Sequence, residues 1–351
     1  MLKWLDQNFL KWFVRIWPKD REHRQLNFKL NRILLIRLGA IGDTILLLPS
    51  LEAILKAYPQ ARIDILAWDV NAEVYKLLGD YPRLKLIRFS SYRGMKPLLK
   101  LMNFAREHRS EYDAVIDLEQ FSYFTAFLSK MFAKAFTFGF DVPGTNRKNL
   151  YDHSVFYDLN RHESLNFFAL INEVFPAAVF KLPERRQTKP DKILGIHPLS
   201  KWPQKIWPQE KFVELVKVLK KQYPAFRIKI YLPENEPSDF FREQLADKAE
   251  LITGKTIPQL AYDLESLSLL IANDNGIMHL AGYTGIPVIG IFGMSDPNQW
   301  HAFHNLENVV KIDIECAPCN KLGRMKACKN YRCINEISVD RVLAQAKKLL
   351  G

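Results

Sequence analysis

The sequence predicts an α/β protein made of two Rossmann-like, doubly wound parallel-sheet domains that face a cleft. Short apolar runs alternate with segments of helical periodicity along most of the chain, a pattern typical of parallel sheets covered by helices. A stretch at 176–192 with three prolines and several charges interrupts the alternation, which then restarts. The length of 351 residues suits two domains. We therefore divide the chain into an N-terminal segment, two domains and a C-terminal helix, at 1–30, 31–180, 190–335 and 336–351.

The first predicted domain begins with a βαβ unit. An apolar run at 32–38 ends at a glycine, and the helical periodicity of 44–58 stops before a proline. The next apolar run, 62–68, completes the unit. The same patterns then predict two further strands and two helices, at 85–89, 114–118, 95–109 and 122–134.

The second predicted domain repeats this alternation. Apolar runs predict five strands, at 193–197, 227–232, 250–252, 268–272 and 288–292. Helical spacing predicts four helices, at 209–222, at 238–248, from Gly276 onward and at 338–350.

The composition narrows the class of protein. Hydrophobic residues make up 48% and charged residues 25%, which is ordinary for a globular protein and excludes a disordered chain, a collagen-like chain and a coiled coil. The net charge of +12 indicates an anionic partner, namely nucleic acid, a phosphorylated ligand or an anionic membrane surface. No helix-turn-helix, RRM or KH signature is visible, so no nucleic-acid partner is expected. A basic stretch at 83–109 would attract an acceptor rich in phosphate and carboxylate.

The first 30 residues form a segment with its own character. Aromatic and aliphatic residues recur there at helical spacing, between seven Lys and Arg side chains. A basic, aromatic-rich amphipathic helix can lie on a bilayer surface, and it can equally pack on its own domain. No apolar run is long enough to cross a membrane, and charges interrupt any signal-peptide pattern. We expect a cytoplasmic protein, with peripheral attachment to the inner face of the membrane as one alternative.

A glycine-containing turn follows the first predicted strand. Gly39 and Gly42 allow a tight turn, and the helix N-terminus behind them offers free N–H groups to an anion. The dinucleotide fingerprint would require glycine where Arg37 stands, which weakens an NAD-binding interpretation. Asp43, at the helix start, is either an N-cap or a general base that takes a proton from an attacking hydroxyl.

Two segments of the second half carry groups suited to phosphate. The loop 197–208 bears Ser200, Lys201 and Lys205, whose hydroxyl and ammonium donors precede a helix. The turn at Asp274 leads from a strand into another helix, where free N–H groups would hold a diphosphate without a metal. The further candidates of this turn are Asn275, Gly276 and His279.

The cysteines lie together near the C-terminus. They are Cys316, Cys319, Cys328 and Cys333. Their spacing is that of a four-thiolate zinc site, and reduced structural thiols are the alternative. Four cysteines in this length are too few for a secreted disulfide scaffold.

From about residue 31 the chain resembles glycosyltransferase family 9, the lipopolysaccharide heptosyltransferases. The matching segments are 38–43, 205–208, 273–279 and 285–293, in that order. The resemblance implies a GT-B fold, with the acceptor on the N-terminal domain and the donor nucleotide on the C-terminal one. It implies inverting transfer of heptose from an ADP-sugar to an anionic lipopolysaccharide core acceptor, without metal or other cofactor.

The same resemblance suggests roles for individual residues. Asp43 matches the proposed catalytic base, in the loop of Gly39 and Gly42, and Lys205 matches a lysine that contacts the donor. The turn with Asp274, Asn275, Gly276 and His279 matches the donor-binding turn. A donor-side acidic residue corresponds to Glu234 or Glu236, of which Glu236 is included in the expected donor-binding set. The alternative function is a nucleotide-sugar-binding protein without transferase activity.

Overall fold

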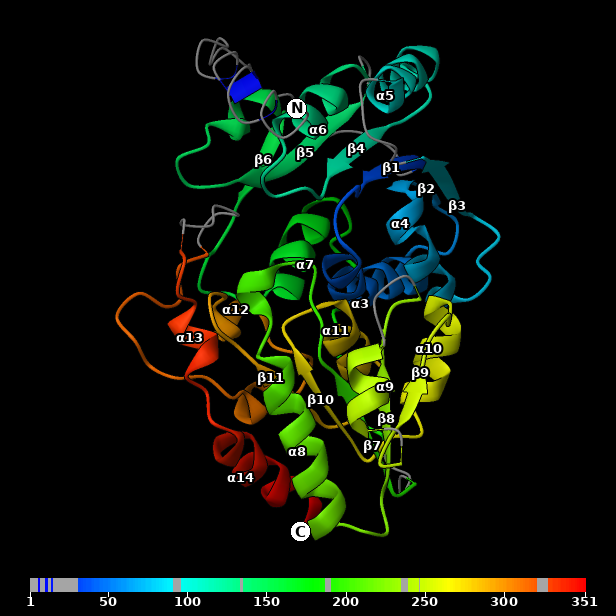
Figure 1. Cartoon of the computed structure of the whole chain (residues 1–351). Coiled ribbons are helices and arrows are strands. Elements are labelled where there is room, and N and C mark those ends of the chain that lie inside the picture. Colours follow the sequence, from blue (N-terminus) through cyan, green and yellow to red (C-terminus); the bar gives the residue numbers. More distant parts are fainter. Residues whose placement is uncertain are drawn as a thin grey trace. The chain divides into compact units, whose positions relative to one another are not determined.

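A computed structural model describes most of the chain, in two compact units, Met1–Lys181 and Leu182–Gly351 (Figure 1). The described residues are 6, 10, 11, 14, 31–90, 96–132, 135–186, 191–234, 239–245, 247–320 and 328–351. The division falls inside the predicted linker at 176–192. Among the described residues, no helix is long and apolar enough to cross a membrane.

The first unit contains a six-stranded sheet in the order β3-β2-β1-β4-β5-β6, in which each strand is parallel to its neighbours. The strands are β1 Arg32–Ile36, β2 Arg62–Trp68, β3 Leu84–Phe89, β4 Ala114–Asp117, β5 Phe136–Asp141 and β6 His153–Phe156. Because β1 lies between β2 and β4, the crossover connections leave it in opposite directions. The carboxyl ends of β1 and β4 therefore form the topological switch point, where ligands of such sheets bind.

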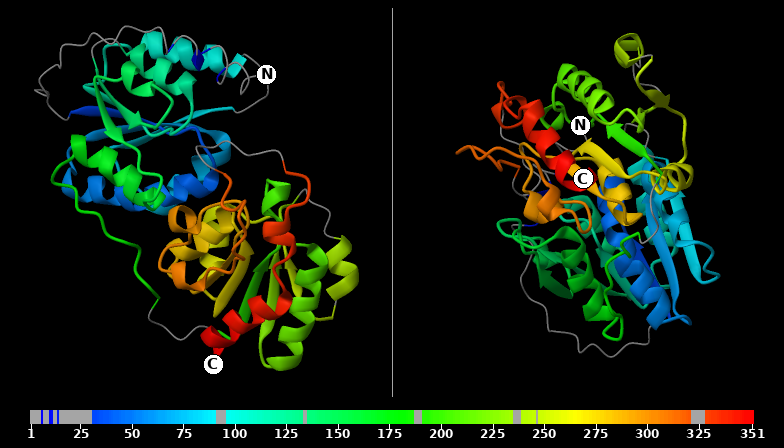
Figure 2. Two further views of the ribbon diagram at one scale, coloured as in Figure 1. Left: turned by 90° about the vertical axis from the view of Figure 1, so that its left-hand side faces the viewer. Right: turned by 90° about the horizontal axis from the view of Figure 1, so that it is seen from below.

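Helices cover both faces of this sheet (Figure 2). On one face lie α5 Lys96–Glu107 and α6 Tyr123–Lys130, whose apolar side chains join those of β1 and β4 in one core cluster. On the other face lie α3 Ile41–Ala57 and α7 Glu163–Val174, which pack on each other. Shorter helical segments complete the unit: α4 Asp69–Ala72, η2 Glu73–Leu78 and η3 Arg147–Leu150.

The second unit contains a five-stranded parallel sheet in the order β11-β10-β7-β8-β9. The strands are β7 Ile193–His197, β8 Arg227–Tyr231, β9 Glu250–Ile252, β10 Leu269–Asn273 and β11 Val288–Ile291. Here β7 has the place of β1 and β10 that of β4, so the loops after these two strands form the second switch point.

The helices and 3-10 turns of the second unit are α8 Gln209–Gln222, α9 Asp239–Leu245, α10 Ile257–Leu264, α11 Gly276–Tyr283, α12 Pro297–Trp300, α13 Arg332–Asn335, α14 Val339–Leu350, η4 Pro203–Lys205 and η5 Leu306–Asn308. The last of the helices, α14, buries Val342 and Ala346 in the same core cluster as α8 and the sheet. The C-terminal helix that we set apart at 336–351 is thus part of the core of this unit.

Several elements differ from the sequence-based expectation. The strands β5 and β6, the helices α7 and α10 and the four-residue helices α4, α12 and α13 were not predicted. In addition, α3 begins at Ile41 instead of residue 44, and its N-cap is Ala40. Asp43 therefore lies inside the first turn of α3, so the prediction that it is the N-cap is wrong.

The N-terminal segment 1–30 falls almost entirely outside the described residues. Of its described positions, Val14 is fully buried in a cluster with Tyr123 and Leu150. The carboxylate of Asp6 accepts a 2.6 Å hydrogen bond from the backbone N–H of Phe124 at the start of α6. These contacts favour packing on the first unit over the membrane-surface alternative at the positions concerned.

Candidate active site

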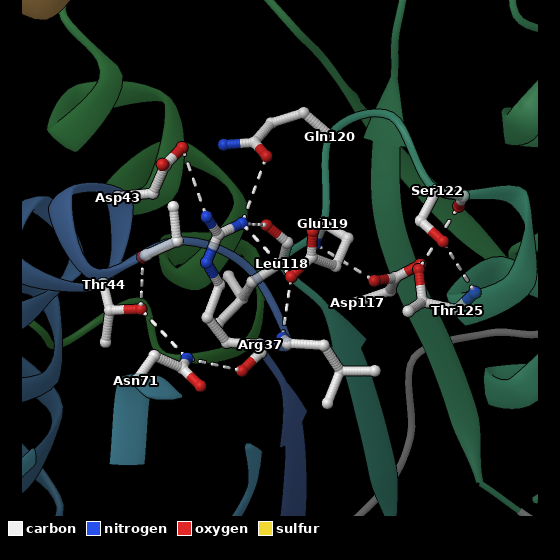
Figure 3. Close-up of polar contacts among 12 residues, drawn as sticks. Arg37, Asp43, Thr44, Asn71, Asp117, Leu118, Glu119, Gln120, Ser122 and Thr125 are labelled. Carbon is white, nitrogen blue, oxygen red and sulfur yellow. Dashed lines mark hydrogen bonds and ion pairs between the residues drawn. The ribbon is translucent and has the colours of Figure 1, made fainter. Parts of the chain in front are cut away.

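The switch point of the first unit is built around a buried arginine (Figure 3). Arg37 directly follows β1 and is only 1% exposed. Its Nη2 lies 3.2 Å from Oδ1 of Asp43, whose side chain is 24% exposed. Asp43 thus presents a partly exposed carboxylate above a buried guanidinium. A partly exposed carboxylate held at a fixed place can meet a substrate hydroxyl and accept its proton.

The loop that follows β4 holds the other side of the same guanidinium. Nη1 of Arg37 donates to the carbonyl of Leu118 at 3.0 Å and to Oε1 of Gln120 at 3.1 Å. It also lies 3.5 Å from Oε1 of Glu119, which accepts a 2.7 Å hydrogen bond from the N–H of Leu38. Burial alone would lower the pKa of Arg37, but the carboxylates of Glu119 and Asp43 outweigh it, so the pKa is raised and the group stays charged.

Gly39 leaves the space that this arginine occupies. A β-carbon at Gly39 would lie 2.5 Å from Nη2 and 2.8 Å from Cζ of Arg37, and 3.0 Å from Oε1 of Glu119. Any side chain there would displace the guanidinium or the turn. Glycine is therefore required at position 39 because the side chain of Arg37 approaches the backbone closely there. The second, Gly42, is buried in the first turn of α3.

A second buried ion pair fixes the loop after β4. Arg147 donates to Oδ2 of Asp117 at 2.9 Å, and both side chains are fully buried. Asp117 also accepts from Thr125 and Tyr151, and Arg147 donates to the carbonyl of Gln120. Burial raises the pKa of Asp117 to about 6 in spite of Arg147. The network ties the loop that contacts Arg37 to α6 and η3.

Glu163, at the start of α7, extends the network inward. Its carboxyl accepts hydrogen bonds from Nε2 of Gln120 and from the hydroxyl of Tyr157. Burial raises the pKa of Glu163 to about 7, and the negative charge of Asp43 adds to the effect. Gln120 thus links this buried carboxyl to Arg37.

The switch point of the second unit is built around a buried carboxylate. Nζ of Lys205 lies 2.6 Å from Oδ2 of Asp274. The lysine side chain is 17% exposed and the aspartate 5%. Burial alone would raise the pKa of Asp274, but Lys205, His279 and Ser295 together lower it. Of the two charged groups, the ammonium of Lys205 is the more exposed, so this site is suited to an anionic ligand.

Asparagines join the two loops of this switch point. Oδ1 of Asn273 accepts from the N–H of Trp207 at 3.1 Å, and its Nδ2 donates to the carbonyl of Pro198 at 2.7 Å. Nδ2 of Asn275 donates to the carbonyl of Leu199 at 2.8 Å. Oδ1 of Asn275 also accepts from the N–H of Met278 at 3.0 Å, which makes it the N-cap of α11.

The other residues expected at the donor site differ in burial and in their contacts with the turn at Asp274. Ser200 donates from Oγ to the carbonyl of Asp274 at a long 3.4 Å, whereas Lys201 is exposed. Gly276 is the first residue of α11, and His279 is buried in the same helix. Of the two alternative acids, Glu234 is exposed beside Gly254, and Glu236 lies outside the described residues.

Four residues of the first site were not singled out from the sequence: Arg37, Glu119, Gln120 and Glu163. Arg37 entered the sequence argument only as a departure from a glycine fingerprint. A usable signal was present, because a charged residue directly after an apolar strand must find a partner at the carboxyl edge of the sheet. Glu119 and Gln120, which also follow a buried strand, are the natural partners.

The described part of the cysteine segment contacts the loop after β11. Among the described residues, no group of three or more His, Cys, Asp or Glu side chains could hold a metal ion, so the zinc alternative gains no support. Cys333 is buried, and burial together with the neighbouring thiols raises its pKa to about 11. The N–H of Cys319 donates to the carbonyl of Met294 at 3.0 Å, in the loop after β11.

Comparisons with known proteins agree with this architecture. Residues 101–330 match the model of glycosyltransferase family 9 (heptosyltransferase). Lipopolysaccharide heptosyltransferase 1 of Campylobacter coli is 25% identical over 350 residues, covering 91% of this chain and 99% of that protein.

Two structures of the Escherichia coli heptosyltransferase WaaC share the fold. The structure with ADP has a TM-score of 0.69 at 16% identity and covers 91% of this chain and 99% of that one. The structure with ADP-2-deoxy-2-fluoro heptose has a TM-score of 0.65 at 18% identity, with coverages of 90% and 99%. Both have the GT-B arrangement that the resemblance implied. The family match, which covers more than half of the chain, shows that this protein belongs to glycosyltransferase family 9, the heptosyltransferases.

Proposed function

We propose that this protein transfers heptose from an ADP-heptose donor to a hydroxyl of a lipopolysaccharide core acceptor, with inversion at the anomeric carbon. The observation that carries the proposal is the pair of unlike switch points. One presents a partly exposed carboxylate, Asp43, and the other a partly exposed ammonium, Lys205. A base for the acceptor and a cation for the leaving diphosphate are the two groups that such a transfer needs.

The proposed step is a single displacement. Asp43 takes the proton of the acceptor hydroxyl while its oxygen forms a bond to the anomeric carbon. The bond from that carbon to the diphosphate oxygen breaks, and ADP departs with the electron pair. Attack in line with the leaving group inverts the configuration of the carbon. Lys205 and the free N–H groups of α11 stabilise the negative charge that develops on the diphosphate.

The donor assignment rests on the relatives as well as on the site. The two WaaC structures are those with ADP and with ADP-2-deoxy-2-fluoro heptose. In this chain, the eight-residue helix α11 begins directly after Asp274 and Asn275, at the carboxyl end of β10. Donor binding by this loop, with Lys205 as the charged contact, follows from the phosphate affinity of helix N-termini.

The experiment is a transfer assay with ADP-heptose and a lipopolysaccharide core acceptor that lacks heptose. We expect a product extended by one heptose, with the anomeric configuration opposite to that of the donor by NMR. Tight ADP binding without any product over a range of acceptors would favour the alternative, a nucleotide-sugar-binding protein. A product with retained configuration would contradict the single displacement.

We propose that the reaction takes place in the cytoplasm at the inner face of the membrane, because a lipid-linked acceptor is presented there. The seven basic residues of segment 1–30 would support attachment to anionic lipid. Co-sedimentation with anionic vesicles, compared between the full chain and a chain without residues 1–24, measures this. Equal sedimentation of the two would place the attachment elsewhere or exclude it.

A further inference from the structure

The arginine behind the proposed base has a role of its own, and this inference rests on the base role proposed for Asp43. We propose that Arg37 is a positioning residue, which holds the Asp43 carboxylate oriented for proton transfer. The interaction lies wholly within the first unit (Figure 3).

The guanidinium has little freedom to move. Nη1 is fixed by the carbonyl of Leu118 and the amide oxygen of Gln120, at 3.0 and 3.1 Å. Because the guanidinium is planar and rigid, fixing Nη1 also fixes Nη2, the atom that lies 3.2 Å from Asp43. The ring of Phe167, 5.3 Å from Cζ, contacts the group as a cation–π partner. The arginine therefore offers Asp43 a donor at a defined place.

The charge balance around Arg37 is uneven. The titratable groups that face it come from four elements: Asp43 of α3, Tyr75 of η2, Glu119 after β4 and Glu163 of α7. Burial raises the pKa of Tyr75, which stays neutral, and raises that of Glu163 to about 7. The two carboxylates in direct contact with the guanidinium are that of Asp43, 3.2 Å from Nη2, and that of Glu119, 3.5 Å from Nη1. Removing the arginine takes away the group that holds Asp43 in place, whereas removing the Glu119 carboxylate leaves the contact with Asp43.

Orientation matters because Asp43 is the more exposed partner. At 24% exposure its carboxylate can also rotate towards water, whereas the arginine is fixed below it. An ion pair with one buried member is screened less than a surface pair, so it can hold the rotamer. A general base that is misoriented loses rate without losing substrate affinity.

The main experiment compares Arg37→Met, Arg37→Lys and Glu119→Gln in the transfer assay. We expect Arg37→Met to lower kcat by about 10²-fold with ADP affinity unchanged, and Arg37→Lys to recover part of the loss. Glu119→Gln removes the second carboxylate partner of Arg37 but leaves the contact with Asp43, so its loss of kcat should be smaller than that of Arg37→Met. A merely structural defect would not lower kcat alone or be rescued by a second cation.

The matched control is Arg32→Lys, at the amino end of the same strand. Arg32 also pairs with a carboxylate, that of Asp64 at 2.9 Å, but lies at the edge of the sheet away from Asp43. This variant keeps the kcat of the wild type. If it lowered kcat as Arg37→Lys does, the effect would belong to strand stability, and the proposal would be overturned.

A second variant keeps the test decisive if the arginine variants do not fold. Gly39→Ala retains Arg37 but places a β-carbon 2.5 Å from Nη2, which forces the guanidinium away from Asp43. Gly195→Ala in the second unit is the steric control, since its β-carbon would meet Leu267 at 2.4 Å. We expect a large loss of kcat only in Gly39→Ala. Equal kcat in the two variants would overturn the proposal.

The proposed function and this inference fail in different ways. If Asp43→Asn retains turnover near the wild-type value, Asp43 is not the base, and both fall. If Asp43→Asn is inactive while Arg37→Met and Gly39→Ala keep the kcat of the wild type, the base role stands and the positioning role of Arg37 is overturned.

Discussion

The two switch points of this protein share one architecture and carry opposite charge arrangements. In the first unit the loop after β1 meets the loop after β4, and in the second unit the loop after β7 meets the loop after β10. Each pair of loops lies at the carboxyl ends of two neighbouring parallel strands. In the first unit the arginine is buried and Asp43 is the exposed partner. In the second unit Asp274 is buried and Lys205 is the more exposed partner.

This difference shows how one fold provides two kinds of chemistry. In both places an ion pair compensates the cost of burying a charge. The buried residue of each ion pair fixes the position of the other residue. The more exposed residue determines which kind of ligand can bind there. A carboxylate at the surface suits a proton donor, and an ammonium suits a diphosphate. The predictions below test this contrast, from the largest expected effect to the smallest.

Lys205→Ala is expected to weaken ADP binding by about 10²-fold. The change removes the cation that would contact the diphosphate and leaves the buried carboxylate of Asp274 uncompensated, which repels the ligand. Lys201→Ala, an exposed lysine of the same loop, serves as the control and should change affinity only slightly. Titration calorimetry with ADP measures both, and equal affinities for the two variants would contradict the assignment of Lys205.

The two units are expected to respond to pH in opposite ways. The pKa of Glu163 in the folded unit is raised to about 7. Glu163 therefore stabilises the first unit fully at pH values below the ordinary pKa of a glutamate, and this stabilisation is lost as pH rises through 7. Burial lowers the pKa of His197 in the folded unit to about 4. His197 therefore stabilises the second unit fully at pH values above the ordinary pKa of a histidine, and this stabilisation is lost as pH falls towards 4.

Hydrogen exchange, corrected for its intrinsic pH dependence, measures the protection of each unit separately. Between about pH 5 and about pH 7.5, protection of the first unit should fall and that of the second should rise. Glu163→Gln and His197→Gln should each flatten the dependence of their own unit. Parallel trends in both units would contradict the contrast.

Asn275→Ala is expected to have the smallest effect, a loss of about 1 kcal/mol in the stability of the second unit. It removes the side-chain cap of α11, in which Oδ1 of Asn275 accepts a hydrogen bond from the N–H of Met278. In the first unit, Ser122 caps α6 in the same way, whereas Ala40 caps α3 without a side-chain bond. The free energy of unfolding in urea measures the loss. An unchanged value would show that Asn275 does not stabilise the helix.

The sequence predicted the fold best where strands are buried and bounded by turns. The strands at Arg62–Trp68 and Ile193–His197 and the helix at Gln209–Gln222 have the predicted bounds, because apolar runs or amphipathic spacing end at polar or proline-containing turns. The strand Phe136–Asp141 contains a glycine that admits the ring of Tyr151, and β6 is an edge strand with an exposed Phe156, so neither shows a clear pattern.

The site could be predicted in part. The turn motifs identified Asp43, Lys205 and Asp274 as candidates, because strand–turn–helix signals are local. Their partners could not be predicted, since the adjacency of β1 and β4 is a property of the sheet order and not of neighbouring residues. Arg37 and Glu119 are 82 positions apart in the chain, and only the fold brings them together.

The central claim is that the exposed carboxylate of the first switch point serves the acceptor and not the nucleotide. Asp43→Asn tests it most directly, with kcat and ADP affinity measured on the same preparation. Glu52→Gln, which changes another carboxylate of α3, is the control. We predict that Asp43→Asn lowers kcat by at least about 10³-fold with ADP affinity unchanged, whereas Glu52→Gln alters neither. Turnover of Asp43→Asn near the wild-type value would contradict the account.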